Sequence, residues 1–214
     1  KPMEEGAALE SGLLNMIGKE VDEAYYKATM SLRLAPEVTE RHGAEMRIVY
    51  TPLHGSGNVP VREILKRIGL SNISVVKEQE APDGSFPTVK APNPEDPNAF
   101  TLAFDLANKT GADLILATDP DSDRLGAAVR GRDGRFQVLT GNQIGSILIH
   151  YILSTRSERG TLPKDGLVVR SIVSTRMADA ICAYYGVELR EVLTGFRFIS
   201  EQIAESLETK EHTF

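Results

Sequence analysis

Three aspartates alternate in the segment 118–125, which reads Thr-Asp-Pro-Asp-Ser-Asp-Arg-Leu. Asp119, Asp121 and Asp123 directly follow the aliphatic run 113–117, so in an extended chain their carboxylates point to one side. At about 4 Å and an effective dielectric near 20, each pair of carboxylates costs on the order of 4 kcal/mol. A divalent cation would reverse this repulsion. An all-oxygen ligand set without His or Cys favours Mg²⁺ or Ca²⁺ over Zn²⁺, and we expect Mg²⁺.

Other interpretations of this acidic segment fit less well. A solvated acidic turn rarely follows so apolar a strand. An EF-hand starting at Asp119 needs Gly at position six and Glu at position twelve, where Arg124 and Arg130 stand. A phosphatase with an aspartyl nucleophile usually has Thr or Val as the fifth residue of its motif, whereas Asp123 stands there in mid-chain. Arg124 offers a fork of donors that matches a phosphate, and a salt bridge back to the aspartates fits it equally well.

Apolar strands and amphipathic helices alternate along the chain and must position this loop. Strands are predicted at 46–50, 73–76, 113–117, 167–170 and 187–192, and helices at 20–34, 59–68, 99–109, 143–153, 175–184 and 198–207. A Gly-Arg-Asp-Gly turn at 131–134 between apolar runs predicts a hairpin. This order predicts an α/β class, with two consecutive α/β units that have mixed, mainly parallel sheets, βαβ connections and one edge hairpin. The polar stretch 154–166 is the predicted domain linker.

The composition excludes several classes of function. Thirty acidic against 24 basic residues give a net charge of −6, which disfavours nucleic acid and anionic lipid as partners. No apolar run approaches the roughly 18 residues of a membrane span. The single cysteine, Cys182, lies in an apolar helical stretch, which indicates a structural thiol and a reducing compartment. A cytoplasmic protein is expected.

Further segments make the acidic loop part of a larger pattern. They read Tyr-Thr-Pro-Leu-His-Gly-Ser-Gly at 50–57, Val-Lys-Glu-Gln-Glu at 76–80, Pro-Asp-Gly-Ser-Phe-Pro at 82–87, Pro-Asn-Pro-Glu at 92–95, Leu-Thr-Gly-Asn-Gln at 139–143 and Leu-Thr-Gly-Phe-Arg-Phe-Ile at 193–199. Together with Asp-Pro-Asp-Ser-Asp-Arg at 119–124, this order resembles the α-D-phosphohexomutases, in their bacterial phosphoglucomutase and phosphomannomutase branch. The resemblance runs over essentially the whole chain.

The resemblance implies an architecture of four domains around one cleft, each contributing a loop. Residues 1–40 match the end of the first domain and a connecting helix. Residues 41–158 match the second, metal-binding domain, and residues 160–214 match the first half of the third. The family's phosphoserine, sugar-binding and distal phosphate-binding loops do not occur in the sequence, so no catalytic residue is expected in this chain.

The resemblance also implies roles for individual residues. The Mg²⁺ ligands would be Asp119, Asp121 and Asp123. Arg124 corresponds to the arginine that reaches the active-site phosphate. Thr194 and Gly195 match the loop that opens the third domain's sugar contacts, and Arg197 stands where the family more often has Lys. Outside these positions, His54 is expected in a hydrogen-bonded turn, and Ser56 or Asn58 is expected to cap the helix that follows.

The activity implied for the parent protein is a Mg²⁺-dependent phosphoglucomutase, which interconverts glucose 1-phosphate and glucose 6-phosphate through a phosphoserine and a bisphosphate intermediate. Its partners would be hexose phosphate, hexose bisphosphate and the missing domains of the same chain. The fragment alone is expected to be inactive. The alternatives are phosphomannomutase or phosphopentomutase activity of the parent, or a non-enzymatic module that binds metal and phosphosugar.

Overall fold

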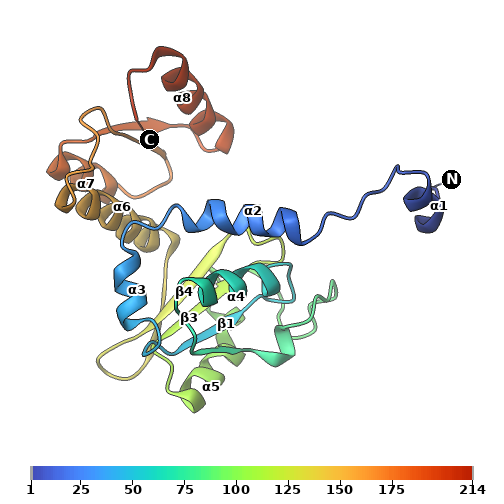
Figure 1. The fold of residues 1–214 in the computed structure, drawn as a ribbon. Helices are drawn as coiled ribbons and strands as arrows, with labels where there is room; N and C mark the ends of the chain where they lie inside the picture. The colour runs from blue at the N-terminus through green and yellow to red at the C-terminus, as the bar shows by residue number, and fades with distance from the viewer. Residues whose placement is uncertain (1, 214) are drawn as a thin grey trace. The chain divides into compact units, whose positions relative to one another are not determined.

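The computed structural model describes residues 2–213 and divides into two compact units, which meet between Arg33 and Leu34 in the sequence. The first unit contains α1 (Glu5–Glu10) and α2 (Lys19–Met30) (Figure 1). Acidic side chains in the first turn of α2 and a lysine in its last turn complement the helix dipole. The predicted helix at 20–34 is confirmed, although it ends at Met30.

A mixed five-stranded sheet forms the centre of the second unit, in the order β2-β1-β3-β4-β5. The strands are β1 (Ile48–Thr51), β2 (Ile73–Val75), β3 (Leu114–Thr118), β4 (Leu125–Arg130) and β5 (Phe136–Leu139). Strand β1 pairs in parallel with β2 and β3, whereas β4 runs antiparallel to both β3 and β5. The predicted α/β class and the β4–β5 edge hairpin are confirmed.

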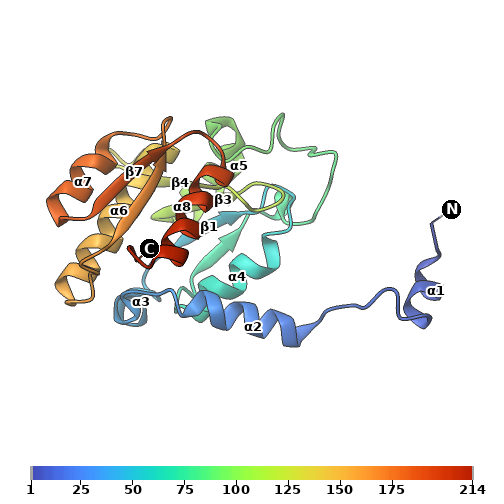
Figure 2. The ribbon, with the colours of Figure 1, turned by 90° about the horizontal axis from the view of Figure 1, so that it is seen from above.

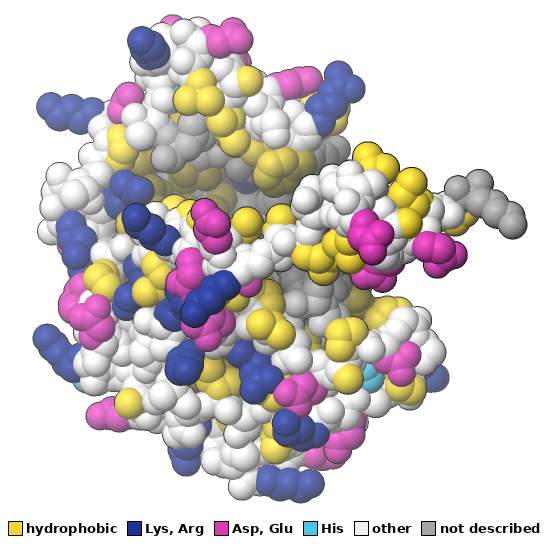
Figure 3. All heavy atoms as spheres, turned by 45° about the vertical axis from the view of Figure 1, so that its right-hand side comes forward, with side chains coloured by type: hydrophobic (Ala, Val, Ile, Leu, Met, Phe, Trp, Pro, Cys, Tyr) yellow, Lys and Arg dark blue, Asp and Glu magenta, His cyan; other side chains and the backbone are white. Residues whose placement is uncertain are grey.

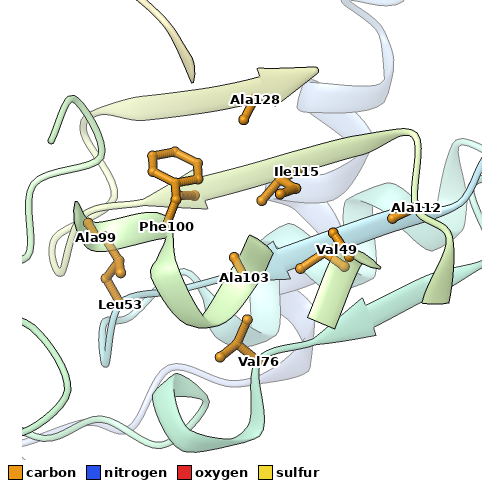
Figure 4. Packing of buried hydrophobic residues seen from close by; sticks show 11 residues of the cluster. Val49, Leu53, Val76, Ala99, Phe100, Ala103, Ala112, Ile115 and Ala128 are labelled. Atoms are coloured by element: carbon orange, nitrogen blue, oxygen red, sulfur yellow. The ribbon is translucent and has the colours of Figure 1, made fainter. Parts of the chain in front are cut away.

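Helices cover both faces of this sheet. Successive residues of β1 point to opposite faces, and all four are buried. On one face, Val49 packs with Ile115 and with Phe100 and Ala103 from the segment that includes α5 (Thr101–Thr110) (Figure 4). On the other face, Ile48 packs with Leu65 of α4 (Asn58–Arg67). The remaining elements before β3 are α3 (Pro36–His42) and the short 3-10 helices η1 (Lys77–Gln79) and η2 (Pro97–Phe100).

The chain continues through α6 (Gly141–Glu158), β6 (Leu167–Ser171), α7 (Met177–Tyr185), β7 (Glu188–Val192) and α8 (Phe196–Thr209). Helix α7 connects β6 to β7, and the two strands pair in parallel, as in a βαβ unit (Figure 2). Helix α6 packs against α7, with Leu153, Cys182 and Val187 in one buried cluster. The start of α6 is fixed by a capping box between Thr140 and Gln143.

The structure corrects the predicted linker at 154–166. Helix α6 runs on to Glu158, and its residue Leu153 packs in one buried cluster with Cys182 and Val187 of the β6–α7–β7 unit. Ser157 and Glu158 are exposed but still helical, and only 159–166 connect α6 to β6. The local composition of 154–158 is typical of a linker, but these residues are the last turn of a packed helix.

Candidate metal centre

The metal loop, residues 118–125, lies at the carboxyl end of β3 and turns the chain into β4. Thr118 and Leu125 pair across the antiparallel ladder, so the intervening residues form a short closed loop. Ligand atoms of Asp119, Asp121 and Asp123 lie within 4.8 Å of one another, as the alternation predicted. Asp119 is buried, whereas the other two carboxylates are exposed. The loop is curled further at Ser122, which has a φ of 63° in the left-handed region.

Arg124 is bound to the buried aspartate. Its backbone N–H donates to Asp119 Oδ1 at 3.0 Å, and its Nε donates to Asp119 Oδ2 at 2.8 Å. Its Nη1 donates to Asn93 Oδ1 at 3.3 Å, which ties the long loop 77–97 to the metal loop. The predicted salt bridge back to the aspartates is therefore present, while about half of the Arg124 side chain (52%) stays exposed to solvent.

The electrostatics of the loop favour a bound cation. Burial raises the pKa of Asp119, but the backbone and side-chain hydrogen bonds from Arg124 outweigh it and hold the pKa below its usual value. The pKa of Asp123 is raised by its contact with Asp119 and by the charge of Asp121. Crowded carboxylates shift each other in this way because their charges repel. A hard divalent cation with oxygen ligands fits this donor set, so the residues present suit Mg²⁺.

A buried hydrogen bond and a close glycine contact lie at the base of the metal loop. The hydroxyl groups of Tyr50 and Thr118 lie 2.8 Å apart in a buried hydrogen bond. Gly57 lies against the same group, since a Cβ there would come within 2.7 Å of both hydroxyl oxygens. A side chain at position 57 would therefore force these hydroxyl groups to move.

The loop that follows β1 contacts the metal loop directly. Ser56 donates two hydrogen bonds to the Pro120 carbonyl oxygen, from its backbone N–H at 2.8 Å and from its Oγ at 3.0 Å. Helix α4 has Gly57 as its N-cap and no side-chain cap hydrogen bond, so the prediction that Ser56 or Asn58 caps this helix is wrong. The Ser56 hydroxyl instead donates its hydrogen bond to the metal loop.

His54 is a buried, hydrogen-bonded turn residue, as predicted. Its Nδ1 lies 3.2 Å from the Ala81 carbonyl oxygen, and its Nε2 lies 2.8 Å from Thr88 Oγ1. Gln79 joins the same buried group, because its amide donates to Thr88 Oγ1 at 3.1 Å and accepts from Thr51 Oγ1 at 2.6 Å. These bonds attach the loop 77–97 to the end of β1.

The predicted sugar-contacting residues lie outside the metal loop: Thr194 and Gly195 are between β7 and α8, and Arg197 is in the first turn of α8. Gly195 is the N-cap of α8 and adopts a φ of 133°, a conformation that favours glycine. Arg197 is exposed; its Nε binds Glu201 at 3.2 Å. Within residues 2–213, no hydrogen bond or ion pair joins Thr194, Gly195 or Arg197 to the metal loop. Their role stays a prediction.

Two sequence profiles of one family match this chain. Residues 23–134 match the profile described as phosphoglucomutase/phosphomannomutase, alpha/beta/alpha domain II, and residues 140–209 match that of domain III. The chain belongs to this family. The metal loop lies in the part that matches domain II, and the β7–α8 loop lies in the part that matches domain III.

Curated relatives and solved structures agree with this assignment. A phosphoglucomutase from Staphylococcus saprophyticus is 40% identical over 197 residues, which cover 92% of this chain and 34% of that protein. One from Staphylococcus aureus is 41% identical over 160 residues, covering 75% of this chain and 28% of that protein. The chain thus spans about a third of the length of these relatives.

Structural neighbours share the fold at lower sequence identity. The putative phosphomannomutase from Thermus thermophilus superposes with a TM-score of 0.65 at 22% identity, covering 87% of this chain and 39% of that one. The N-acetylphosphoglucosamine mutase from Aspergillus fumigatus in complex with GlcNAc-6P and magnesium has a TM-score of 0.54 at 16% identity, covering 88% of this chain and 38% of that one.

Sequence reasoning missed the residues that support the metal loop, chiefly Tyr50, Ser56 and Gly57. A signal for them existed. The strand before Pro52 is β1 and the strand before Asp119 is β3, and these two are parallel neighbours. The carboxyl ends of parallel strands meet at one edge of a sheet. The strand order, which places β1 beside β3, is what brings the Gly-Ser-Gly turn and the acidic loop together.

Proposed function

We propose that this chain is the metal-binding part of a Mg²⁺-dependent phosphoglucomutase, which interconverts glucose 1-phosphate and glucose 6-phosphate. The observation that carries the proposal is the cluster of three carboxylates with Arg124 beside it, at the carboxyl end of a buried strand. The phosphoglucomutases from Staphylococcus support the choice of reaction, since they share 40–41% identity with this chain.

In this proposal, Asp119, Asp121 and Asp123 hold Mg²⁺, which when bound neutralises phosphate charge as a Lewis acid and template. Arg124 is anchored to Asp119 through Nε and to Asn93 through Nη1, so its guanidinium is oriented before a phosphate arrives. Catalysis of phosphoryl transfer rests on such positioning and charge neutralisation.

The phosphoryl group would come from a phosphoserine outside these 214 residues, with a hexose bisphosphate as the intermediate. Thr194 and Gly195 would contact the sugar from the β7–α8 loop, and Arg197 would do so from the first turn of α8. Because the phosphoserine segment is absent from this sequence, we expect the isolated chain to be inactive. The packing of α6 on α7, together with the domain III match that starts at residue 140, favours a domain boundary before α6 rather than at 158–160.

Turnover measurements test the proposed reaction. The 214-residue chain should show no mutase activity with glucose 1-phosphate, whereas a full-length parent should be active and should lose activity on Asp121→Ala. Tests with mannose 1-phosphate and ribose 1-phosphate separate phosphoglucomutase from the phosphomannomutase and phosphopentomutase alternatives. Robust turnover by the 214-residue chain alone would show that the proposed division of the active site is wrong.

Calorimetry tests the alternative of a non-enzymatic module that binds metal and phosphosugar. In that case the isolated chain binds both MgCl₂ and glucose 6-phosphate. Under the mutase proposal, binding of Mg²⁺ is weak because a phosphoserine ligand is missing, and Asp121→Ala weakens it further. If the wild-type chain and Asp121→Ala take up Mg²⁺ equally, the assigned triad is not the metal site.

A further inference from the structure

We propose that the clamp loop, residues Pro52–Gly57 between β1 and α4, fixes the shape of the metal loop before an ion binds, and that Ser56 is its positioning residue. This inference rests on the proposed Mg²⁺ site. Strands β1 and β3 are parallel neighbours, with Thr51 opposite Ala117, so the loops that follow them lie at the same edge of the sheet.

The clamp acts on a single backbone oxygen. Pro120 lies between two proposed ligands, Asp119 and Asp121, and it has no N–H, so its carbonyl is the only backbone hydrogen-bonding group there. Ser56 donates to this oxygen twice, from the backbone at 2.8 Å and from Oγ at 3.0 Å. Holding the carbonyl fixes the peptide plane between Pro120 and Asp121, and thereby the direction in which the Asp121 side chain leaves the backbone.

The clamp loop is itself held in an unusual conformation. Leu53 and His54 have positive φ values of 46° and 62°, which such residues keep only when their surroundings impose them. The His54 imidazole is bound to Ala81 and Thr88, and its backbone N–H donates to the Gln79 carbonyl oxygen at 2.9 Å. The clamp loop is therefore anchored to the loop 77–97 as well as to the metal loop.

Close packing completes the contact. A Cβ on Gly55 would lie 2.4 Å from the Pro120 Cα and 2.6 Å from its carbonyl oxygen, so only glycine lets the two backbones approach this closely. Three carboxylates within 4.8 Å repel one another in the absence of an ion. A loop held against this repulsion loses less conformational freedom when it binds Mg²⁺, which is the advantage of preorganisation.

The test is Ser56→Ala in the 214-residue chain, with two readouts by NMR. The dissociation constant for Mg²⁺ alone should rise about three- to tenfold, as expected for one lost hydrogen bond. In EDTA, hydrogen exchange of the Ser122 and Arg124 amides should accelerate by a similar factor, while the amide of Ile115 in β3 exchanges as in wild type. The conservative Ser56→Thr keeps a hydroxyl and should restore both values.

Ser146→Ala is the matched control, because it also removes a serine hydroxyl bonded to a carbonyl oxygen, that of Asn142 at 2.8 Å in α6. It should leave both readouts unchanged. Equal Mg²⁺ affinity and equal exchange in wild type and Ser56→Ala would overturn the clamp. If wild type binds no Mg²⁺, the proposed metal site fails, and exchange in EDTA still decides the clamp: unchanged exchange refutes it, and faster exchange confined to 119–124 supports it.

Discussion

Gly126→Ala probes the contact between the loop 77–97 and the sheet beside the metal loop. A Cβ on Gly126 would lie 2.2 Å from the Pro94 carbonyl oxygen and 2.8 Å from the Pro94 Cβ. Ordinary contact begins at 3.4 Å, so the first separation must widen by 1.2 Å, the difference between the two distances. Strand β4 is fixed between β3 and β5, and the loop must therefore move.

This displacement has two expected consequences. Overpacking of this kind costs about 1–3 kcal/mol of folding free energy. Asn93, which precedes Pro94, binds Arg124 Nη1 at 3.3 Å, close to the upper limit for a hydrogen bond, so a shift of this size breaks the bond. Arg124 then keeps its bonds to Asp119 but loses its second anchor.

Urea denaturation in EDTA, followed by circular dichroism, measures the stability. With a slope of about 2 kcal/mol per molar urea, the midpoint of Gly126→Ala should fall by roughly 0.5–1.5 M. Gly145→Ala is the control: a Cβ there meets nothing within 4 Å and lies inside α6, where alanine is favoured over glycine by about 0.5–1 kcal/mol. Its midpoint should rise. A midpoint for Gly126→Ala at or above the wild-type value would refute the close approach of Pro94 to β4.

Two further substitutions test other contacts. Tyr50→Phe should cost about 1–2 kcal/mol, because it leaves the buried Thr118 hydroxyl without its partner. Burial raises the pKa of Tyr50, so the unfolded chain releases the phenol proton at lower pH than the folded chain does. Wild type should therefore lose stability as pH rises past about 10. The difference in unfolding free energy between wild type and Tyr50→Phe, measured in urea, should become smaller there. Arg170→Ala should lower Tm several times more than Arg176→Ala, since the Arg170 side chain is 5% exposed and that of Arg176 is 90% exposed, although both contact Asp179. Equal shifts in a thermal melt would contradict a structural role for Arg170.

Much of the fold was predictable because it follows from local periodicity. The aliphatic run before Asp119 predicted a buried strand, and β3 begins at Leu114 and ends at Thr118. The predicted helix before Gly111 is α5, which ends at Thr110 with Gly111 in the left-handed conformation. Alternation over two residues and apolar spacing over three or four are set by backbone geometry, so they remain visible in the sequence.

None of the 8 α-helices within the described range 2–213 is long and apolar enough to cross a membrane. On the face shown in Figure 3, Lys and Arg side chains are mixed with Asp and Glu side chains.

The extent of α6 was mispredicted for a physical reason. Residues 154–158 contain Ser, Thr, Arg and Glu, which favour a linker when read locally. The apolar residues that decide the outcome, Cys182 and Val187, lie some thirty residues further along the chain and pack against Leu153. Burial by distant residues overrides local composition, and no local pattern reports it.

The sequence by itself indicated the candidate ligands of this site. Alternating carboxylates after a buried strand suggest the chemistry, because three like charges so close together repel one another and a divalent cation would offset that repulsion. Only the tertiary structure decided how those ligands are held. Ser56 and Asn93 lie 64 and 31 residues from the atoms they bind, Pro120 and Arg124, and the sheet brings them together. Hydrogen bonds across such separations depend on strand order and loop packing, which a local pattern of residues does not encode.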